Sequence, residues 1–525
     1  MSSNYPSNYP STYPNNYPTD PQDVWKYFKE ISSIPRGSGN EEKIRNYLID
    51  FAKKNDFPSK TDQVGNVYIY VPATIGYENH PSIIIQNHMD MVCDATSDIK
   101  FDFKNDPLQL ITTQDGYVKA NKTTLGADNG IGMAIALALT QNQNQNKNQT
   151  QTQVQHPAIE LVFTVEEETG LIGAQHFVKE YVKSRKILNF DSGNWGNLYI
   201  GCAGSIKVEL KTNFTEEDMD DHALAYRLRV SGFKGGHSGG EINKQKGNAI
   251  KFLLDCLKRL DANDIKYSIH GFVAGKAHNI IPREALVVIC MNPSVENEIN
   301  VNNILNQTKD AWLSFLPEID KEFSFSLERC PVHTDKEATK VLNNKDKKRF
   351  LSILNLIPHG VESYSVENHY DSNNCHLPSL SSNFAICKLH DGEMFLQSSI
   401  RFFNTKECFK LLTIFETVAS AFEIDLNIKW VYPSWPAKAN IDVNENQLLK
   451  TIKRNYQNLF NSNPQVLITH SGLECGVLVD RLNSNNIEAI SFGTNIKGAH
   501  TPDEKVEVAS VQNFWKLIIS VMKEL

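Results

Sequence analysis

The sequence predicts an α/β protein in which one domain is inserted into another. Short apolar runs at 67–71, 82–85, 159–165 and 187–190 have the length and composition of buried strands. Stretches with helical spacing or helix-like apolar composition accompany them, for example within 24–31 and 123–139. Candidate metal-binding groups occur before residue 205 and after residue 435, and the block between has helix and strand patterns of its own. That arrangement indicates an insertion.

Composition restricts the class of protein. The 525 residues carry 53 Lys and Arg against 61 Asp and Glu, a formal charge of −8, and this mild acidity argues against nucleic-acid and anionic-membrane partners. No apolar run has the length of a membrane span, and the N-terminal MSSNYPSNYPSTYPNNYP lacks the basic and apolar blocks of a signal peptide. Nine cysteines without a CxxC pair favour a reducing compartment. We therefore expect a cytoplasmic enzyme with no nucleic-acid or membrane partner.

The first elements follow in order along the chain. Residues 1–19 contain four Tyr-Pro units, and because each Pro removes a backbone donor we expect a disordered tail, with a docking motif as the alternative. Val24, Phe28 and Ile31 share one face of a predicted helix. A turn at 35–39 precedes Asn40, which resembles the N-cap of a second helix.

The remaining elements define the predicted domains. A polar loop in 123–139 runs into an apolar helix, and the Gln/Asn-rich tract 140–155 is predicted to be a surface insertion. The block 205–435 includes the Gly-rich GFKGGHSGG at 232–240, a helix at 248–260 and an alternating strand at 323–327. We therefore expect 20–204 and 436–525 to form one domain and 205–435 the inserted one.

Five polar clusters each end an apolar run or lie in a loop. They contain His88 and Asp90, Asp128, Glu166 to Glu168, Asp191, and His500. Taken singly, each has an ordinary structural explanation, such as a surface pair, a solvated face or a cap. In open α/β sheets, however, ligands bind beyond the carboxyl ends of the strands, where such clusters meet.

The donor types in these clusters favour a metal centre. Carboxylates crowded at one site repel one another, so a positive charge is needed to hold them together. Imidazole and carboxylate donors without thiolates suit zinc, manganese or cobalt. Five or so ligands exceed the need of one tetrahedral zinc, whereas two metals about 3.5–4 Å apart, bridged by a carboxylate, would use them all.

Nine stretches in sequence order resemble metallopeptidase family M20, and specifically its aminoacyl-histidine dipeptidase branch. They cover the chain from about residue 23 to 508 and read VWKYFKEISSIPRGSGNEEKI, NHMDMVCD, TTLGADNGIGMAIALAL, EEETGLIGA, LNFDS, GFKGGHSGGEI, AHNIIPREA, THSGLECG and GAHTPDEKVEV. The resemblance implies a zinc-peptidase-like catalytic domain, a mixed sheet flanked by helices, with an inserted α+β lid and dimerisation domain. It also implies two divalent metal ions, most simply Zn²⁺, with Co²⁺ or Mn²⁺ as alternatives.

The resemblance also implies a role for each matched residue. Asp90 would orient a metal-binding imidazole, and Glu167 would be the general base. Counting back from Gly170 gives this register; one place earlier, Glu166 would be the base. The implied metal ligands are His88, Asp128, Glu168, Asp191 and His500.

The implied substrates are small peptides. His237 matches the lid histidine, which in dimeric relatives reaches the neighbouring subunit, so we expect a homodimer. Arg401 is the candidate for the substrate carboxylate, because a guanidinium offers a fork of donors, and Asn279 and Gly472 are further candidates. The implied reaction is hydrolysis of unblocked dipeptides, including Xaa-His dipeptides. The alternatives are an M20 tripeptidase, an N-acyl-amino-acid deacylase, or a non-catalytic scaffold.

Overall fold

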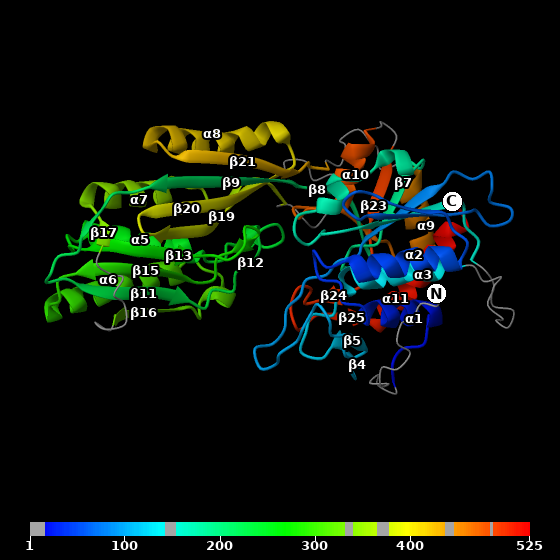
Figure 1. Ribbon diagram of the computed structural model, residues 1–525, viewed down its shortest axis with the longest axis horizontal. Helices are drawn as coiled ribbons and strands as arrows, with labels where there is room; N and C mark the ends of the chain where they lie inside the picture. Colours follow the sequence, from blue (N-terminus) through cyan, green and yellow to red (C-terminus); the bar gives the residue numbers. More distant parts are fainter. Residues whose placement is uncertain (1–15, 142–153, 331–339, 365–376, 436–445, 484–486) are drawn as a thin grey trace. The chain divides into compact units, whose positions relative to one another are not determined.

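The computed structural model describes residues 16–141, 154–330, 340–364, 377–435, 446–483 and 487–525 (Figure 1). The chain divides into two compact units. Unit 1 comprises Met1–Gly201, Ala437–Ile468 and Leu473–Leu525, and unit 2 comprises Cys202–Pro436 and Thr469–Gly472. The chain therefore passes from one unit to the other four times, and the last visit to unit 2 is only four residues long.

Unit 1 is built on an eight-stranded mixed sheet in the order β1-β2-β6-β3-β7-β23-β8-β22. Its four central strands, β6, β3, β7 and β23, are parallel, and every residue of β3 and β6 is buried. The bounds are β1 Ser59–Thr61, β2 Val67–Val71, β3 Ile83–His88, β6 Ile159–Thr164, β7 Lys186–Asn189, β8 Asn197–Cys202, β22 Gln465–Thr469 and β23 Glu488–Ser491.

Helices contact this sheet, and the apolar α3 lies closest to its centre, against β3 and β6. The close packing of α3 on the sheet requires a glycine at position 132, because a Cβ added to Gly132 would lie 2.5 Å from the carbonyl oxygen of Phe190. The helices of unit 1 are α1 Gln22–Ser32, α2 Glu42–Lys54, α3 Ala127–Thr140, α4 Ile172–Gln175, α9 Gln447–Phe460, α10 Glu474–Leu482 and α11 Val508–Met522. A small antiparallel sheet joins β4 Leu110–Thr112, β5 Tyr117–Ala120, β25 Lys505–Glu507 and β24 Ile496–Lys497.

Unit 2 is built on an antiparallel nine-stranded sheet, with four helices among its described residues. The strand order is β16-β11-β15-β13-β19-β20-β9-β21, with β18 paired to β19. The bounds are β9 Gly204–Asn213, β11 Leu224–Ser231, β13 Ser268–Ala274, β15 Ala285–Met291, β16 Ser324–Arg329, β18 Gly360–Tyr364, β19 Pro378–His390, β20 Glu393–Phe402 and β21 Asp425–Tyr432. Two short pairs join β10 Glu216–Asp218 to β17 Lys340–Leu342 and β12 Gly236–His237 to β14 Ile280–Ile281. The helices are α5 Ala249–Ala262, α6 Val295–Leu313, α7 Asn344–Leu356 and α8 Thr405–Phe422.

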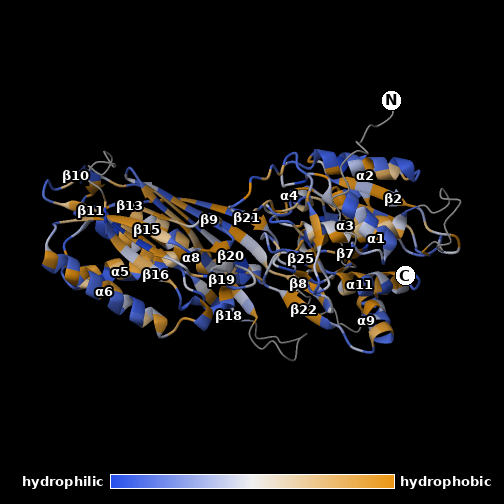
Figure 2. Ribbon diagram, turned by 90° about the horizontal axis from the view of Figure 1, so that it is seen from below, coloured by the Kyte–Doolittle hydropathy of each residue, from blue (hydrophilic) through white to orange (hydrophobic). Residues whose placement is uncertain are grey.

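The core of unit 2 lies between this sheet and its helices. Side chains of β11 alternate between buried and more exposed positions, so Tyr226, Leu228 and Val230 enter the core together with one face of α5. Figure 2 shows hydrophobic and hydrophilic residues alternating along α6 and α9, as expected for helices with one face on the protein.

The predicted mixed α/β fold is confirmed, and the differences are local. Strand β3 continues to His88 instead of ending at Ile85, so this histidine belongs to the sheet. The predicted Asn40 cap is wrong, because α2 begins at Glu42 without a side-chain cap. The side chain of Glu41 accepts instead from the backbone amides of Gly39 and Glu166.

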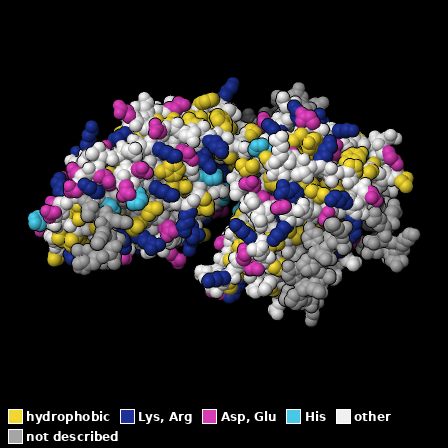
Figure 3. All heavy atoms as spheres, viewed as in Figure 1, with side chains coloured by type: hydrophobic (Ala, Val, Ile, Leu, Met, Phe, Trp, Pro, Cys, Tyr) yellow, Lys and Arg dark blue, Asp and Glu magenta, His cyan; other side chains and the backbone are white. Residues whose placement is uncertain are grey.

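Several sequence features fall partly or wholly outside the described residues. Residues 1–15 and 142–153, which hold most of the Tyr-Pro repeats and of the Gln/Asn tract, are not described. Within the predicted tail, Tyr17 packs edge-on against Trp25 with ring centroids 5.8 Å apart. In the described part of the chain, no helix combines the length and the apolar character needed to cross a membrane. Basic and acidic side chains are interspersed over the face drawn in Figure 3.

Candidate functional site

The parallel strands of unit 1 bring the first cluster together. Strands β6, β3 and β7 are neighbours and run in the same direction, so their carboxyl ends meet at one edge of the sheet. His88 ends β3, Glu167 and Glu168 follow β6, and Asp191 follows β7. Asp128 enters from the first turn of α3, and His500 from the loop between β24 and β25. All five predicted metal ligands and both predicted catalytic residues therefore lie in unit 1.

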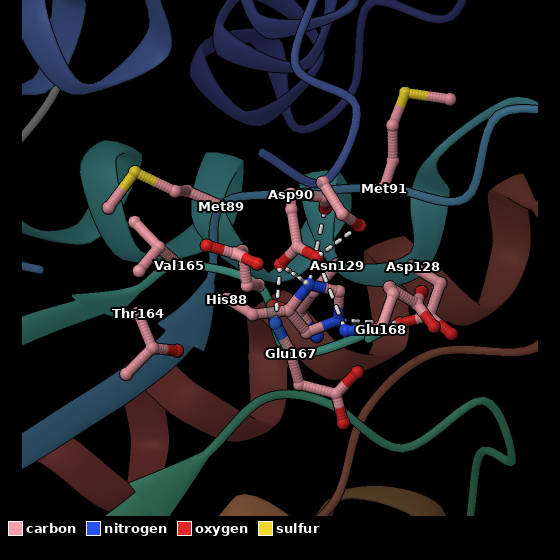
Figure 4. Close-up of polar contacts among 12 residues, drawn as sticks. His88, Met89, Asp90, Met91, Asp128, Asn129, Thr164, Val165, Glu167 and Glu168 are labelled. Atoms are coloured by element: carbon pink, nitrogen blue, oxygen red, sulfur yellow. Dashed lines mark hydrogen bonds and ion pairs between the residues drawn. The ribbon is translucent and has the colours of Figure 1, made fainter. Parts of the chain in front are cut away.

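Two imidazoles contact opposite oxygens of one carboxylate. His88 Nε2 lies 3.0 Å from Asp128 Oδ1, and His500 Nε2 lies 3.2 Å from Asp128 Oδ2. Each imidazole also has a carboxylate of its own. Asp191 Oδ1 is 3.3 Å from His88 Nε2, and Glu168 Oε2 is 3.1 Å from His500 Nε2. The cluster thus has two halves that share Asp128. Figure 4 shows His88, Asp128 and Glu168 close together.

Asp90 connects an imidazole to the glutamate segment. Its Oδ1 lies 3.3 Å from His88 Nδ1, the ring nitrogen that faces away from Asp128. The same carboxylate accepts from the backbone amides of Glu167 at 3.0 Å and Glu168 at 3.2 Å, and from the Ser38 hydroxyl at 2.7 Å. Asp90 is fully buried, and although burial opposes its charge, the contact with His88 lowers its pKa. One carboxylate therefore orients both the imidazole and the segment that follows β6.

Negative charge is in excess at this site. Burial raises the pKa of Glu168 to about 7 and that of Asp191 to about 6, with the charge of Asp128 adding to both. Burial also raises the pKa of Glu167 well above its usual range. For His88, burial is outweighed by Asp191 and the other carboxylates, which raise its pKa well above the usual value. These carboxylates would ionise together only if further positive charge entered the site.

The donor set fits divalent metal ions. Ligand atoms of His88, Asp128 and Glu168 all lie within 4.8 Å of one another. The Oε1 of Glu168 is buried without a hydrogen-bond partner among the described residues, which leaves it available to a cation. Oxygen and imidazole nitrogen donors without sulfur match zinc, manganese and cobalt.

The three consecutive glutamates differ in their surroundings. Glu168 contacts His500, and Glu167 lies in the cluster close to His88 and Glu168, as Figure 4 shows. Glu166 has a left-handed backbone (φ 48°), and its carboxylate contacts the Thr169 hydroxyl at 3.5 Å. The Glu166 carboxylate thus contacts the neighbouring Thr169, whereas the Glu168 carboxylate contacts an imidazole of the cluster.

Several buried residues around this cluster were not singled out from the sequence. Asn129 donates to Asp191 Oδ1 at 2.6 Å, and Glu474 accepts from the Thr164 hydroxyl at 2.8 Å and from Gln86. Burial raises the pKa of Glu474 to about 8. Arg36 and Glu504 hold backbone groups of the ligand-bearing segments. Their only sequence signal was their position inside the family-like stretches, because a buried charge has no local pattern.

The second cluster lies in unit 2 and has Arg401 at its centre. This guanidinium is 3% exposed, and it contacts three polar atoms, none of which belongs to a carboxylate. They are the Ser238 hydroxyl at 3.2 Å, the Tyr432 hydroxyl at 2.9 Å and His237 Nε2 at 3.1 Å. Arg401 forms no ion pair among the residues that the structure describes. A buried cation of this kind favours an anionic ligand.

The remaining predicted substrate-binding residues belong to the same cluster. The carbonyl oxygen of Asn279 accepts from the backbone amide of Ser238 at 2.8 Å, so this residue acts here through its main chain. Gly472 packs against the Tyr432 ring, and an added Cβ would lie 2.4 Å from the Tyr432 hydroxyl oxygen. Sequence reasoning missed Tyr432, which lacks a motif of its own, and Ser238, which was not singled out although it follows His237 in the Gly-rich stretch at 232–240. The eleven predicted site residues thus form two clusters, one in each unit.

Comparisons with known proteins agree with the site. The model of peptidase family M20/M25/M40 matches residues 84–524. The chain is 32% identical over 506 residues to the cytosol non-specific dipeptidase of Escherichia coli (strain K12), covering 96% of this chain and 98% of that protein. The crystal structure of aminoacylhistidine dipeptidase from Vibrio alginolyticus is similar with a TM-score of 0.72 and 29% identity, covering 96% and 97% of the two chains. A tripeptidase from Staphylococcus aureus shares the fold, with a TM-score of 0.52, 16% identity and coverage of 96% and 98%. The predicted resemblance is confirmed, and the chain belongs to peptidase family M20/M25/M40.

Proposed function

We propose that this protein is a metal-dependent dipeptidase that hydrolyses unblocked dipeptides, Xaa-His dipeptides among them. The observation that carries the proposal is the division of the unit 1 cluster about Asp128, whose two oxygens contact different imidazoles. A carboxylate placed in this way is suited to bridge two metal ions. The names of the two most similar proteins described above, both dipeptidases, support this substrate class.

The distances support one set of ligands for each metal. His88 and Asp191 would bind the first ion, His500 and Glu168 the second, and Asp128 both. Two divalent ions, which we propose to be zinc, with cobalt and manganese as alternatives, would polarise the peptide carbonyl and acidify a water molecule. Glu167 would take a proton from that water at its carboxylate and deliver it to the departing amine. Asp90 would hold His88 in the orientation and tautomer that metal binding needs.

Unit 2 would supply the groups that recognise the substrate. Arg401 would bind the free carboxylate of the dipeptide, because its guanidinium is buried, preoriented by Ser238 and Tyr432, and lacks an acidic partner among the described residues. His237, which is exposed, would contribute a hydrogen bond to the substrate, and Asn279 and Gly472 would shape the cluster through their main chains. We also propose that the protein is cytoplasmic and that it forms a homodimer. Sedimentation of the purified chain would measure the oligomeric state.

The test is release of free histidine from an Xaa-His dipeptide. We expect release by the purified chain, loss of release with a chelator, and recovery on addition of Zn²⁺. The N-acetylated dipeptide and an Xaa-Xaa-His tripeptide are the controls, because they distinguish a dipeptidase from a deacylase and from a tripeptidase. Hydrolysis of either control in preference to the free dipeptide would reassign the substrate. Absence of metal uptake and of all hydrolysis would point to the scaffold.

A further inference from the structure

Two buried residues of opposite charge lie beside the unit 1 cluster without belonging to the proposed ligand set. Arg36 is 1% exposed and Glu504 is 2% exposed. Neither contacts a proposed ligand side chain through its charged group. Both bind main-chain groups of the segments that carry those ligands.

Arg36 joins two ligand-bearing segments. Its Nη1 donates to the carbonyl oxygens of Met89 at 3.1 Å and Asp90 at 2.6 Å, directly after His88. Its Nη2 donates to the carbonyl oxygen of Gly126, two residues before Asp128. Burial lowers the pKa of Arg36, and the charges of Asp90 and Glu504 oppose this effect. The guanidinium is therefore a rigid link between the end of β3 and the start of α3.

Glu504 joins the same start of α3 to a third segment. Its Oε2 accepts from the backbone amides of Leu125 at 2.8 Å and Gly126 at 2.9 Å, and its Oε1 accepts from the amide of Asp128 at 3.2 Å. Glu504 follows His500 in the loop that ends at β25. The carboxylate thus fixes the position of the His500 loop relative to Asp128.

The segment 125–128 is held from both sides. Its amides bind the Glu504 carboxylate, and its Gly126 carbonyl binds the Arg36 guanidinium. Gly126 has a left-handed backbone (φ 63°), and an added Cβ would lie 2.6 Å from Arg36 Nη2. The glycine therefore permits both the turn and the close approach of the guanidinium.

We propose that Arg36 and Glu504 are a pair of positioning residues that hold the segments of His88, Asp128 and His500 in metal-binding geometry before any metal enters. The inference rests on the proposed metal centre and extends it. Carboxylates crowded in the metal-free protein repel one another, so their segments need an independent support. Groups behind metal ligands typically contribute about 10–100-fold to metal affinity or activity.

The first experiment replaces Glu504 and compares the variant with a matched control. Glu160 is also buried and also accepts backbone amides, from Lys183 and Ser184, but it lies at the start of β6, away from the cluster. Both E504Q and E160Q replace an acceptor-only carboxylate with an amide of similar size. We expect E504Q to lower Zn²⁺ affinity about 10–100-fold, measured by competition with a chromophoric chelator, and to change the visible spectrum of the Co²⁺-loaded protein. E160Q should lower thermal stability while leaving metal affinity within about twofold of the unsubstituted chain.

A second substitution tests the other half of the pair. R36M removes all the donors, whereas R36K keeps a charge that cannot span both segments, so we expect metal affinity in the order unsubstituted, R36K, R36M. In both, kcat for the dipeptide should fall with little change in KM, because substrate binding is not the function assigned to Arg36.

Hydrogen exchange on the unsubstituted, chelator-treated chain needs no variant. The amides of Leu125, Gly126 and Asp128 should be protected without metal. Free exchange of these amides, or wild-type metal affinity in E504Q and R36K, would overturn the proposal. An unsubstituted chain that binds two metals but hydrolyses no dipeptide would overturn the proposed function alone, since the positioning effect is measured by metal affinity.

Discussion

The clusters in the two units have opposite charge requirements. In unit 1, Asp90, Asp128, Glu167, Glu168 and Asp191 surround two imidazoles, and burial keeps several of these carboxylates from ionising together. In unit 2, one buried guanidinium contacts two hydroxyls and an imidazole, and it has no ion pair with a carboxylate among the described residues. Within the described residues, the first cluster has an excess of carboxylates, and the second has a guanidinium without a carboxylate partner.

The difference shows how function can be inferred from incomplete charge balance. Buried charges in proteins are normally paired, so an unpaired one marks the place of a ligand. Divalent metals would complete the unit 1 cluster, and the carboxylate of a free dipeptide would complete the unit 2 cluster. Substitutions in one cluster therefore test the ligand of that cluster separately from the ligand of the other.

The largest effect is expected in unit 1. E167Q removes the proposed proton acceptor while keeping the size of the side chain, so kcat should fall by about 10²–10⁴-fold with both metals still bound. Metal content by atomic emission and dipeptide hydrolysis together make the measurement.

The neighbouring glutamate is the matched control. E166A should leave kcat within about twofold, because the Glu166 carboxylate contacts only the Thr169 side chain within the described residues. An active E167Q with an inactive E166A would move the general base one place back along the chain.

The next effect is expected in unit 2. R401M removes the proposed carboxylate partner, so kcat/KM for a free dipeptide should fall about 100-fold, an amount typical of truncating one side of a buried charged pair. The matching dipeptide amide should be a poor substrate of the unsubstituted chain and should change little in R401M. If kcat/KM in R401M fell equally for the free dipeptide and for the dipeptide amide, Arg401 would serve only the packing of unit 2.

We expect acid to lower the free energy of unfolding through a buried histidine of unit 2. His470 is 2% exposed, and burial, with the nearby charge of Arg401, lowers its pKa to about 3. The native state keeps this imidazole neutral, whereas the unfolded chain gains a proton below its ordinary pKa of about 6.5. Stability should therefore be full above that pKa and fall as the pH drops toward 3, by on the order of 1 kcal/mol per pH unit.

Urea unfolding at about pH 7 and about pH 4.5 measures this loss. In H470Q the side chain keeps a hydrogen-bonding group for Ser381 but cannot titrate, so the decrease should be smaller. Equal decreases in both proteins would assign the acid sensitivity to other groups.

The smallest effect concerns the orientation of Arg401. Y432F removes the hydroxyl that accepts from Nη1 at 2.9 Å, a loss of about 0.5–1.5 kcal/mol. KM for the free dipeptide should rise by up to about tenfold at constant kcat. A change in kcat alone would remove Tyr432 from the recognition of the carboxylate.

Most of the fold could be predicted from the sequence because local patterns encode it. The apolar run at Val67–Val71 is a strand with the predicted bounds, and Val24, Phe28 and Ile31 are fully buried in α1. The end of strand β3 at His88 was not predicted, because in the sequence a polar residue inside a sheet looks the same as one in a loop until its partners are known. Asn40 was mistaken for a cap because Glu41 binds the amides of distant Glu166 and nearby Gly39.

The site could be predicted only where family-like motifs carried it. The unit 1 residues that end strands were found, since strand ends and polar clusters coincide in the sequence. Arg36, Glu474 and Glu504 were not, because their importance depends on burial and on backbone partners remote in the chain. Tyr432 likewise becomes recognisable only through its contacts with Arg401 and Gly472.

The brief return of the chain to unit 2 at Thr469–Gly472 bears on how such a gene can be rearranged. A recombinant fragment of residues 202–436 would lack Gly472, which packs on Tyr432, and Ser471, whose hydroxyl lies 3.5 Å from His237 Nδ1. Recombination that exchanged the inserted block at its two outer boundaries would therefore separate these partners. An exchange that preserved these contacts would have to carry the four residues Thr469–Gly472 together with the inserted block.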